Sequence, residues 1–114
     1  MTGTLGSKLY ALHDKQLGGF ITWQEKGTSA VFLFTNSDLA ERYAYEVHHH
    51  RPIVVYLIHK SKSRDFIGQM LNAGIEYALI NVPPEHADTF NVYEDEVVRN
   101  YAIVDLRKVK SRLS

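Results

Sequence analysis

Three apolar blocks separated by two capped amphipathic segments dominate the stretch from Ala30 to Val82. The blocks are short, rich in β-branched and aromatic residues, and bounded by turn-forming residues, which is typical of strands. The two segments between them place their apolar residues three and four positions apart, which is the spacing of an amphipathic helix. This order predicts a β-α-β-α-β unit, and therefore an α/β fold at the border with α+β.

The first predicted helix begins just after the apolar block Ala30–Phe34. Asn36 or Ser37 can accept a hydrogen bond from the free amides of the first turn, and Asp38 complements the positive end of a helix. Pro52 prevents the helix from continuing because it has no amide hydrogen. The apolar stripe of this helix consists of Leu39, Ala40, Tyr43, Ala44 and Val47.

The second predicted helix follows the apolar block Ile53–Ile58. Ser61 or Ser63 is expected to cap its start. Gly74 is expected to end it in a Schellman motif, with Ile75 supplying the apolar contact that accompanies such a stop. The apolar stripe of this helix consists of Phe66, Ile67, Met70 and Leu71.

Strands are also expected on both sides of the central unit. Lys8–His13 and Phe20–Gln24 should pair as an antiparallel hairpin across a glycine turn, and Glu25–Thr28 should turn the chain into the next strand. Tyr77–Val82 is the third block of the central unit, and Tyr101–Leu106 is expected as a last strand at a sheet edge. The chain should therefore form a single mixed β-sheet of five to six strands.

The 114 residues are close to the usual size of one domain. We expect 1–114 to fold as a single domain with loose termini at 1–7 and 107–114. Short helical turns are expected at Pro84–Asp88 and Asp95–Arg99.

The composition narrows the compartment and the partners. The chain has no cysteine, which fits a reducing compartment, so we expect it in the cytoplasm. No apolar run approaches the ~20 residues that a helix needs to cross a bilayer. The net charge is zero, which does not favour nucleic acid, and the basic segment Arg107–Arg112 is expected to be a solvated end. We therefore expect neither a membrane nor a nucleic acid as partner.

Two of the predicted strands are apolar on both of their alternating faces. Ala30–Phe34 and Ile53–Ile58 have this pattern, which indicates strands that are covered on both sides. Two short helices cover about one face of such a sheet, so either the helices divide between the faces or a second copy covers one of them. We expect a homodimer, because large exposed apolar patches are uncommon on monomers.

A cluster of polar residues at a strand end suits an anionic ligand. His59 to Arg64 opens a helix and combines free amides, hydroxyls and cations, which is chemistry suited to phosphate. Asn36 and Asn81 should lie at the same carboxyl edge of the sheet, where ligands of open α/β sheets bind. Alternatively, the serines only cap the helix and the lysines only solvate it. The predicted ligand-binding residues are Asn36, Ser37, His59, Lys60, Ser61, Ser63 and Arg64.

Motifs with an established chemistry are absent from the sequence. Neither glycine-rich phosphate loop, G-x-G-x-x-G or G-x-x-x-x-G-K-[ST], occurs, and there is no G-x-S-x-G nucleophile turn. His48, His49 and His50 are adjacent, and successive helical residues point about 100° apart, so they cannot face one metal together. A helix cap or a pH-sensitive surface suits them better. We predict no catalytic residues, no metal and no cofactor.

The segment Val31–Ala40 (VFLFTNSDLA) resembles a part of the SseB-like N-terminal domain family. In that family a hydrophobic strand ends in Phe-Thr-Ser and runs into a helix that carries a small residue. The resemblance implies a small accessory or interaction module without an established catalytic set. Asn36 interrupts the Thr-Ser pair here, and the histidine triplet has no counterpart, so no functional residue is carried over.

The sequence thus favours a non-enzymatic protein-interaction or regulatory module that acts as a homodimer. The alternative is a binding or enzymatic site for a phosphate-bearing ligand at the carboxyl edge of the sheet.

Overall fold

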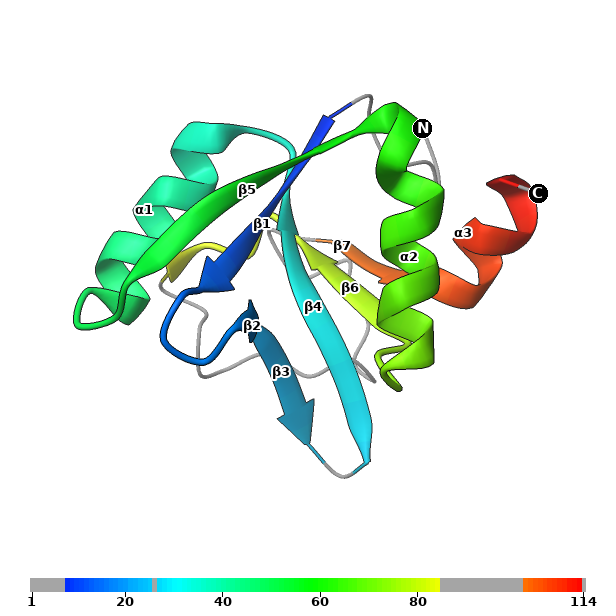
Figure 1. The fold of residues 1–114 in the computed structure, drawn as a ribbon, viewed down its shortest axis with the longest axis horizontal. Coiled ribbons are helices and arrows are strands. Elements are labelled where there is room, and N and C mark those ends of the chain that lie inside the picture. Colours follow the sequence, from blue (N-terminus) through cyan, green and yellow to red (C-terminus); the bar gives the residue numbers. More distant parts are fainter. Residues whose placement is uncertain (1–7, 26, 85–101, 114) are drawn as a thin grey trace.

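The computed structural model describes residues 8–25, 27–84 and 102–113 (Figure 1). They form one mixed sheet of seven strands with helices against it, which confirms the predicted α/β fold. The predicted turn at Asp95–Arg99, and all of Pro84–Asp88 except its first residue, lie outside the described residues.

The strands are β1 (Lys8–Asp14), β2 (Gly19–Phe20), β3 (Thr22–Glu25), β4 (Thr28–Phe34), β5 (Ile53–His59), β6 (Tyr77–Ile80) and β7 (Ala102–Asp105). The helices are α1 (Ser37–His48), α2 (Ser63–Asn72) and α3 (Leu106–Leu113), and a 3₁₀ turn, η1 (Lys60–Lys62), leads into α2.

Five of the strands follow one another across the sheet in the order β5, β1, β4, β6, β7, while β2 pairs with β1 and β3 with β4. Only β4 and β6 pair in parallel; the other pairings among the described strands are antiparallel. Strands β4, β5 and β6 point the same way, as the β-α-β-α-β pattern predicts, but β1 lies between β4 and β5.

The sheet has seven strands rather than five to six partly because the predicted strand Phe20–Gln24 is divided. At Ile21 the chain passes from pairing with β1 to pairing with β4: its amide donates to the carbonyl of Leu12 at 2.8 Å, and its carbonyl accepts from the amide of Phe32 at 3.5 Å. β2 and β3 therefore fill the space where β1 and β4 diverge.

The helices divide between the two faces of the sheet, with α1 on one and α2 and α3 on the other (Figure 1). The face under α1 buries Ala40 and Tyr43 against the aromatic rings of Phe32 and Phe34. Of the two arrangements that the sequence allowed, division of the helices is the one found. A second copy of the chain is therefore not needed to cover a face.

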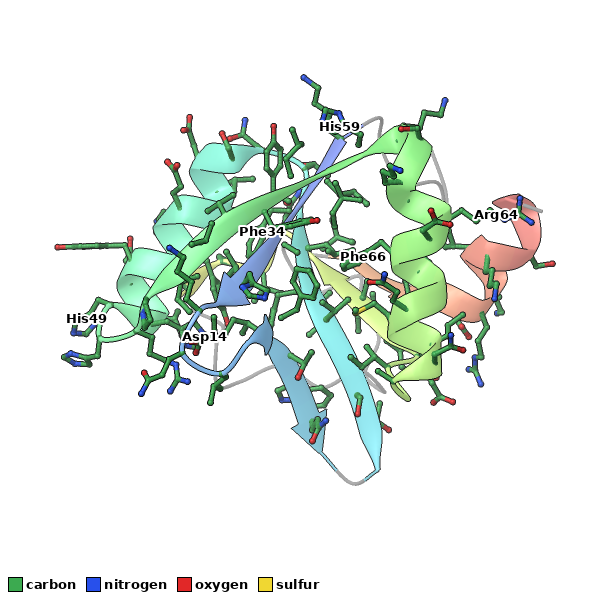
Figure 2. All side chains as sticks on the ribbon, viewed as in Figure 1. Asp14, Phe34, His49, His59, Arg64 and Phe66 are labelled. Atoms are coloured by element: carbon green, nitrogen blue, oxygen red, sulfur yellow. The ribbon has the colours of Figure 1, made fainter. Side chains whose placement is uncertain are left out.

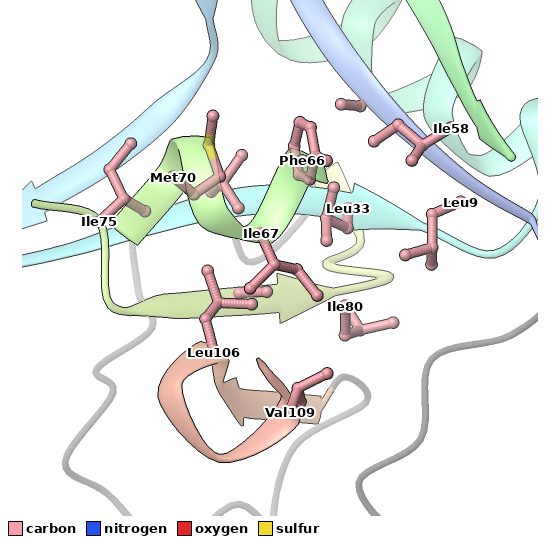
Figure 3. Close-up of a cluster of buried hydrophobic side chains, with 13 residues drawn as sticks. Leu9, Leu33, Ile58, Phe66, Ile67, Met70, Ile75, Ile80, Leu106 and Val109 are labelled. Atoms are coloured by element: carbon pink, nitrogen blue, oxygen red, sulfur yellow. The ribbon is translucent and has the colours of Figure 1, made fainter. Parts of the chain in front are cut away.

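Residues 106–113 form the helix α3, so the expectation of a loose terminus at 107–114 is wrong for them. Leu106 and Val109 are buried and lie in one apolar cluster with Ile67 of α2 and Ile80 of β6 (Figure 3). The amide of Leu106 also donates to the carbonyl of Glu76 at 2.9 Å. Burial of one apolar side of a basic helix fixes it to the sheet.

Strand β5 departs from the expectation of burial on both faces. Val54, Tyr56 and Leu57 are 40%, 50% and 38% exposed, whereas every residue of β4 is buried or half-buried. Among the described residues β5 pairs with β1 alone, so it is an edge strand. An apolar run by itself does not distinguish a central strand from an apolar edge.

The predicted stop of the second helix is confirmed. Gly74 has φ +84°, and the amide of Ile75 donates to the carbonyl of Met70 at 2.9 Å, which is the long bond of a Schellman motif. Gly74 is followed by the buried Ile75, and the chain enters β6 from there.

Candidate functional site

Asn36 and Asn81 lie at the carboxyl end of the parallel pair β4 and β6, as predicted, but both act in the backbone structure. The side chain of Asn36 accepts a hydrogen bond from the amide of Asp38 at 2.7 Å and so caps α1. Asn81 has φ +60°, and its side chain makes two hydrogen bonds of 2.9 Å to the amide and hydroxyl of Thr35. This pair ties the strand end of β6 to the start of α1.

The segment after β5 starts a helix, but neither serine caps it. Lys60–Lys62 form a 3₁₀ turn before α2, and the residues at the two N-cap positions, His59 and Lys62, make no side-chain capping hydrogen bond. Ser63 is buried, and its hydroxyl donates to the carbonyl of Lys60 at 2.6 Å. The prediction that Ser61 or Ser63 caps this helix is therefore wrong, because the hydroxyl of Ser63 is used as a donor within the turn.

The predicted ligand residues divide between places that the structure does not join. His59 lies at the end of β5, whereas Arg64 projects from α2 on the side nearer α3 (Figure 2). Strand β1 separates the end of β5 from the end of β4, where Asn36 and Ser37 lie. Two hollows border β5 in the described part of the chain, and His59 is the one predicted ligand-binding residue that lines either of them. Phosphate binding by this set stays a prediction.

The three adjacent histidines are spread over the end of α1. His48 is the last helical residue and half-buried, whereas His49 and His50 are exposed and their rings contact each other with centroids 3.7 Å apart. Within the described parts of the chain, no group of three or more histidine, cysteine, aspartate or glutamate side chains is placed to hold a metal ion.

An ion pair between a buried carboxylate and a partly exposed arginine lies close to His48. Asp14, at the end of β1, has a buried side chain that accepts a hydrogen bond from Arg51, in the loop between α1 and β5. Burial raises the pKa of Asp14, but the hydrogen bonds from Arg51 and from the amides of Leu17 and Gln16 outweigh it and hold that pKa below its usual value. The sequence offers no signal for this pair, because its members are far apart along the chain.

On the side of β5 away from β1, no described strand pairs with the backbone, and the direction of its N–H and C=O groups follows from the register. The amide of Lys15 donates to the carbonyl of Pro52, directly opposite, at 3.1 Å. In an antiparallel ladder, opposed residues alternate between pairs that exchange hydrogen bonds and pairs that do not. Pro52 belongs to a hydrogen-bonded pair, so every second residue after it, Val54, Tyr56 and Ile58, has its backbone N–H and C=O facing β1.

The alternate residues of β5 consequently direct their backbone groups away from β1. Val55 and Leu57 have both N–H and C=O on the open side, whereas the C=O of His59 begins the 3₁₀ turn η1. No other described strand pairs with Val55 or Leu57. The amide of Ile53 instead donates to the carbonyl of Arg51 at 2.9 Å. An edge with such free groups is a template for one more strand.

Hollows border this edge on both faces of the sheet. The hollow on the α1 side has a volume of about 420 Å³, and its lining includes Tyr45, His49, Ile53 and Val55. The hollow on the α2 side has a volume of about 370 Å³, and its lining includes Phe20, Tyr56, Phe66 and Gln69. A strand added to β5 would direct its alternate side chains over these two hollows.

An aromatic row fixes the wall on the α2 side. Phe20 lies between Tyr56 and Phe66, with ring centroids 5.5 and 5.3 Å apart and the rings nearly perpendicular, an arrangement that aromatic pairs favour. The side of Tyr56 that faces Phe20 is thus held in place, while half of its surface stays exposed.

Models of known protein families give no match to this sequence. A comparison with curated proteins gives no match either. The resemblance to the SseB-like N-terminal domain family therefore stays a prediction.

Among the described residues, every helix is too short or too polar to cross a membrane.

Proposed function

We propose that the protein is a non-enzymatic protein-interaction module, that it works as a homodimer, and that its interaction surface is the open edge of β5. The observation that carries this proposal is the combination of free backbone groups with exposed apolar side chains on one strand. Val54, Tyr56 and Leu57 supply the exposed apolar surface, and Val55 and Leu57 supply the free hydrogen-bonding groups.

The edge lacks the features by which monomeric proteins protect such strands. Proteins keep edges from pairing with charged residues, prolines, bulges or very short strands. Between Ile53 and Ile58 the strand has no charge and no proline, and it pairs with β1 without a bulge along its full length. An edge of this kind attracts another strand, so a protein that keeps it is expected to use it.

The polar groups at the carboxyl edge support this choice over a small-molecule site. Asn36 caps α1, Asn81 is bonded to Thr35, and the hydroxyl of Ser63 donates to a carbonyl within its own turn. These groups are occupied by the fold and would have to exchange partners to bind a ligand.

Sedimentation equilibrium of the full chain tests the proposal. We expect a mass twice the 13.1 kDa of one chain at micromolar concentrations, and a monomer for Val54→Lys and for Tyr56→Lys. Both residues are exposed, so these variants should keep the fold, which circular dichroism checks. Leu17→Lys is the matched control: Leu17 is 73% exposed but lies in the turn after β1, so this variant should remain a dimer.

A compact monomer for the unchanged chain at high micromolar concentration would remove the proposal. If Val54→Lys and Tyr56→Lys both remained dimers, the proposed dimer would stand, but its interface would lie away from β5.

A further inference from the structure

We infer that the strand added to β5 is the β5 of a second copy, antiparallel to the first, with the two-fold axis at Tyr56. The two sheets then join into one continuous sheet. This inference rests on the proposed function and adds the partner segment, its direction and its register.

The backbone of β5 is complementary to itself in this register. With Tyr56 opposite the partner's Tyr56, Val55 lies opposite the partner's Leu57. Both residues direct their amide and carbonyl groups to the open edge, so they form a pair that exchanges hydrogen bonds in both directions. Tyr56 directs its own backbone groups to β1, so the residues on the axis form the closer pair that exchanges no hydrogen bonds between copies.

The side chains are also complementary in this register. Each apolar residue between positions 54 and 58 meets another apolar residue: Val54 lies opposite the partner's Ile58, and Val55 opposite the partner's Leu57. Cross-strand pairs of aromatic and β-branched residues stabilise a sheet. Every one of the exposed residues Val54, Tyr56 and Leu57 thus gains an apolar neighbour.

The two hollows give the added side chains a place on each face. Ile53 and Val55 border the hollow on the α1 side, where the partner's Leu57 would lie beside Val55. Tyr56 and Ile58 border the hollow on the α2 side, where the partner's Tyr56 and Val54 would lie.

Registers displaced along the strand fit less well. An axis at Leu57 would place Val55 opposite the partner's His59 and leave Ile53 and Val54 without opposed strand residues. An axis at Val55 would place Leu57 opposite the partner's Ile53, whose amide already bonds to Arg51. It would also leave Ile58 and His59 without opposed strand residues. The axis at Tyr56, the middle residue of β5, places every residue of the strand opposite another and keeps Ile53, whose amide bonds to Arg51, at the two ends of the pairing.

Disulfide trapping tests the register directly, because the chain has no cysteine of its own. Opposed residues that exchange no hydrogen bonds have Cα atoms about 4.5 Å apart, which lies within the range that a disulfide spans. Tyr56→Cys alone should therefore form a covalent dimer under mild oxidation, which reduction reverses. Val55→Cys and Leu57→Cys are the matched controls, since neither residue meets itself, and both should stay uncrosslinked at the same concentration.

A measurement on the unchanged side chains supports the same conclusion independently. In a mixture of isotope-labelled and unlabelled chains, nuclear Overhauser effects between copies should connect the methyl groups of Val54 with those of Ile58. Their presence supports the register even if Tyr56→Cys folds poorly.

The outcomes separate the inference from the proposed function. Efficient crosslinking at position 55 or 57 in place of 56 overturns the register. The chain could sediment as a dimer yet show no crosslink at positions 55 to 57 and no nuclear Overhauser effect between Val54 and Ile58 of different copies. That result overturns the β5 pairing but not the dimer. A monomeric unchanged chain overturns both.

Discussion

The Nε of Arg51 donates a hydrogen bond to Oδ2 of Asp14 at 2.5 Å, and the Asp14 side chain is only 1% exposed. The other carboxylate oxygen accepts from the amides of Gln16 and Leu17, at 2.9 and 3.2 Å. One buried carboxylate thereby fixes the turn after β1 and the loop before β5. Arg51 directly precedes Pro52, so this contact also sets where β5 begins.

Replacing Asp14 with Asn tests the contribution of this carboxylate. The substitution keeps the size of the side chain but leaves the Arg51 guanidinium without its counter-charge, so we expect a clear fall in the melting temperature at neutral pH. The folded-state pKa of Asp14 lies below 3.8, so the stabilisation is complete above that value and is lost as the pH falls through the folded pKa. The difference between the two proteins in thermal melts should therefore shrink below about pH 4.

Glu46→Gln is the control for the Asp14 substitution. Glu46 pairs with Arg42 on the surface of α1 at 2.9 Å, and its side chain is 45% exposed. An exposed pair of this spacing contributes roughly 0.3–0.5 kcal/mol. A melting temperature lowered as much by this change as by Asp14→Asn would contradict the structural role given to the buried carboxylate.

His48 is expected to make the fold less stable in mild acid. Burial lowers its pKa below 6.5, the positive charge of Arg51 lowers it further, and Asp14 opposes both. The folded state therefore favours the neutral ring, so the stabilisation is complete above pH 6.5 and is lost as the pH falls from there through the folded pKa. Urea unfolding of His48→Gln between pH 7.5 and 5 should show a flatter pH dependence than the unchanged protein. A slope that His48→Gln leaves unchanged would contradict the role given to this ring.

Asn81 allows its backbone and side-chain roles to be separated. Asn81→Gly keeps the left-handed backbone but removes the bonds to Thr35, which we expect to cost about 1 kcal/mol. Asn81→Ala removes the same bonds but keeps a Cβ in the left-handed region without the polar side chain by which Asn tolerates it, at an additional cost of ~1 kcal/mol. Chemical denaturation should therefore rank the unchanged protein above Gly and Gly above Ala. Equal stability of the two variants would mean that the backbone conformation at position 81 relaxes.

Local signals in the sequence predicted most of the elements, because these signals act over a few residues. Asn36 caps the helix that it precedes, and Gly74 stops the next one in the predicted motif. The position of β1 between β4 and β5 had no local signal, since it depends on pairing between distant segments. Helix α3 did have one: Leu106 and Val109 are three residues apart, but the surrounding basic residues favoured a solvated tail.

The candidate site was harder to predict than the fold. The apolar run of β5 predicts burial on both faces, although the same run also suits an edge strand with exposed apolar side chains. The polar cluster from His59 to Arg64 was found as a helix start, but the directions of its side chains depend on the 3₁₀ turn that intervenes. Sequence spacing alone does not contain those directions.

Two glycines of different backbone conformation, one helical and one left-handed, give a matched pair of substitutions. Gly68 lies inside α2, and a Cβ there would meet no atom within 4 Å, so Gly68→Ala should stabilise the protein by about 0.5–1 kcal/mol. Gly74 has φ +84°, so Gly74→Ala should destabilise it by ~1 kcal/mol. The midpoint of urea denaturation should therefore rise for Gly68→Ala and fall for Gly74→Ala. A loss of stability in Gly68→Ala would contradict the open space around the position of the added Cβ.

Proline substitutions at adjacent positions of β5 distinguish the open edge from the paired one. The amide of Leu57 faces the open edge, so Leu57→Pro should remove a donor of the proposed pairing between copies while leaving the pairing with β1 intact. The amide of Ile58 faces β1, and Ile58 is buried, so Ile58→Pro should disrupt the sheet itself. We expect a folded monomer for the first variant by circular dichroism and sedimentation, and a strongly destabilised protein for the second. A folded Leu57→Pro protein that remains a dimer would show that hydrogen bonds from β5 do not hold the copies together.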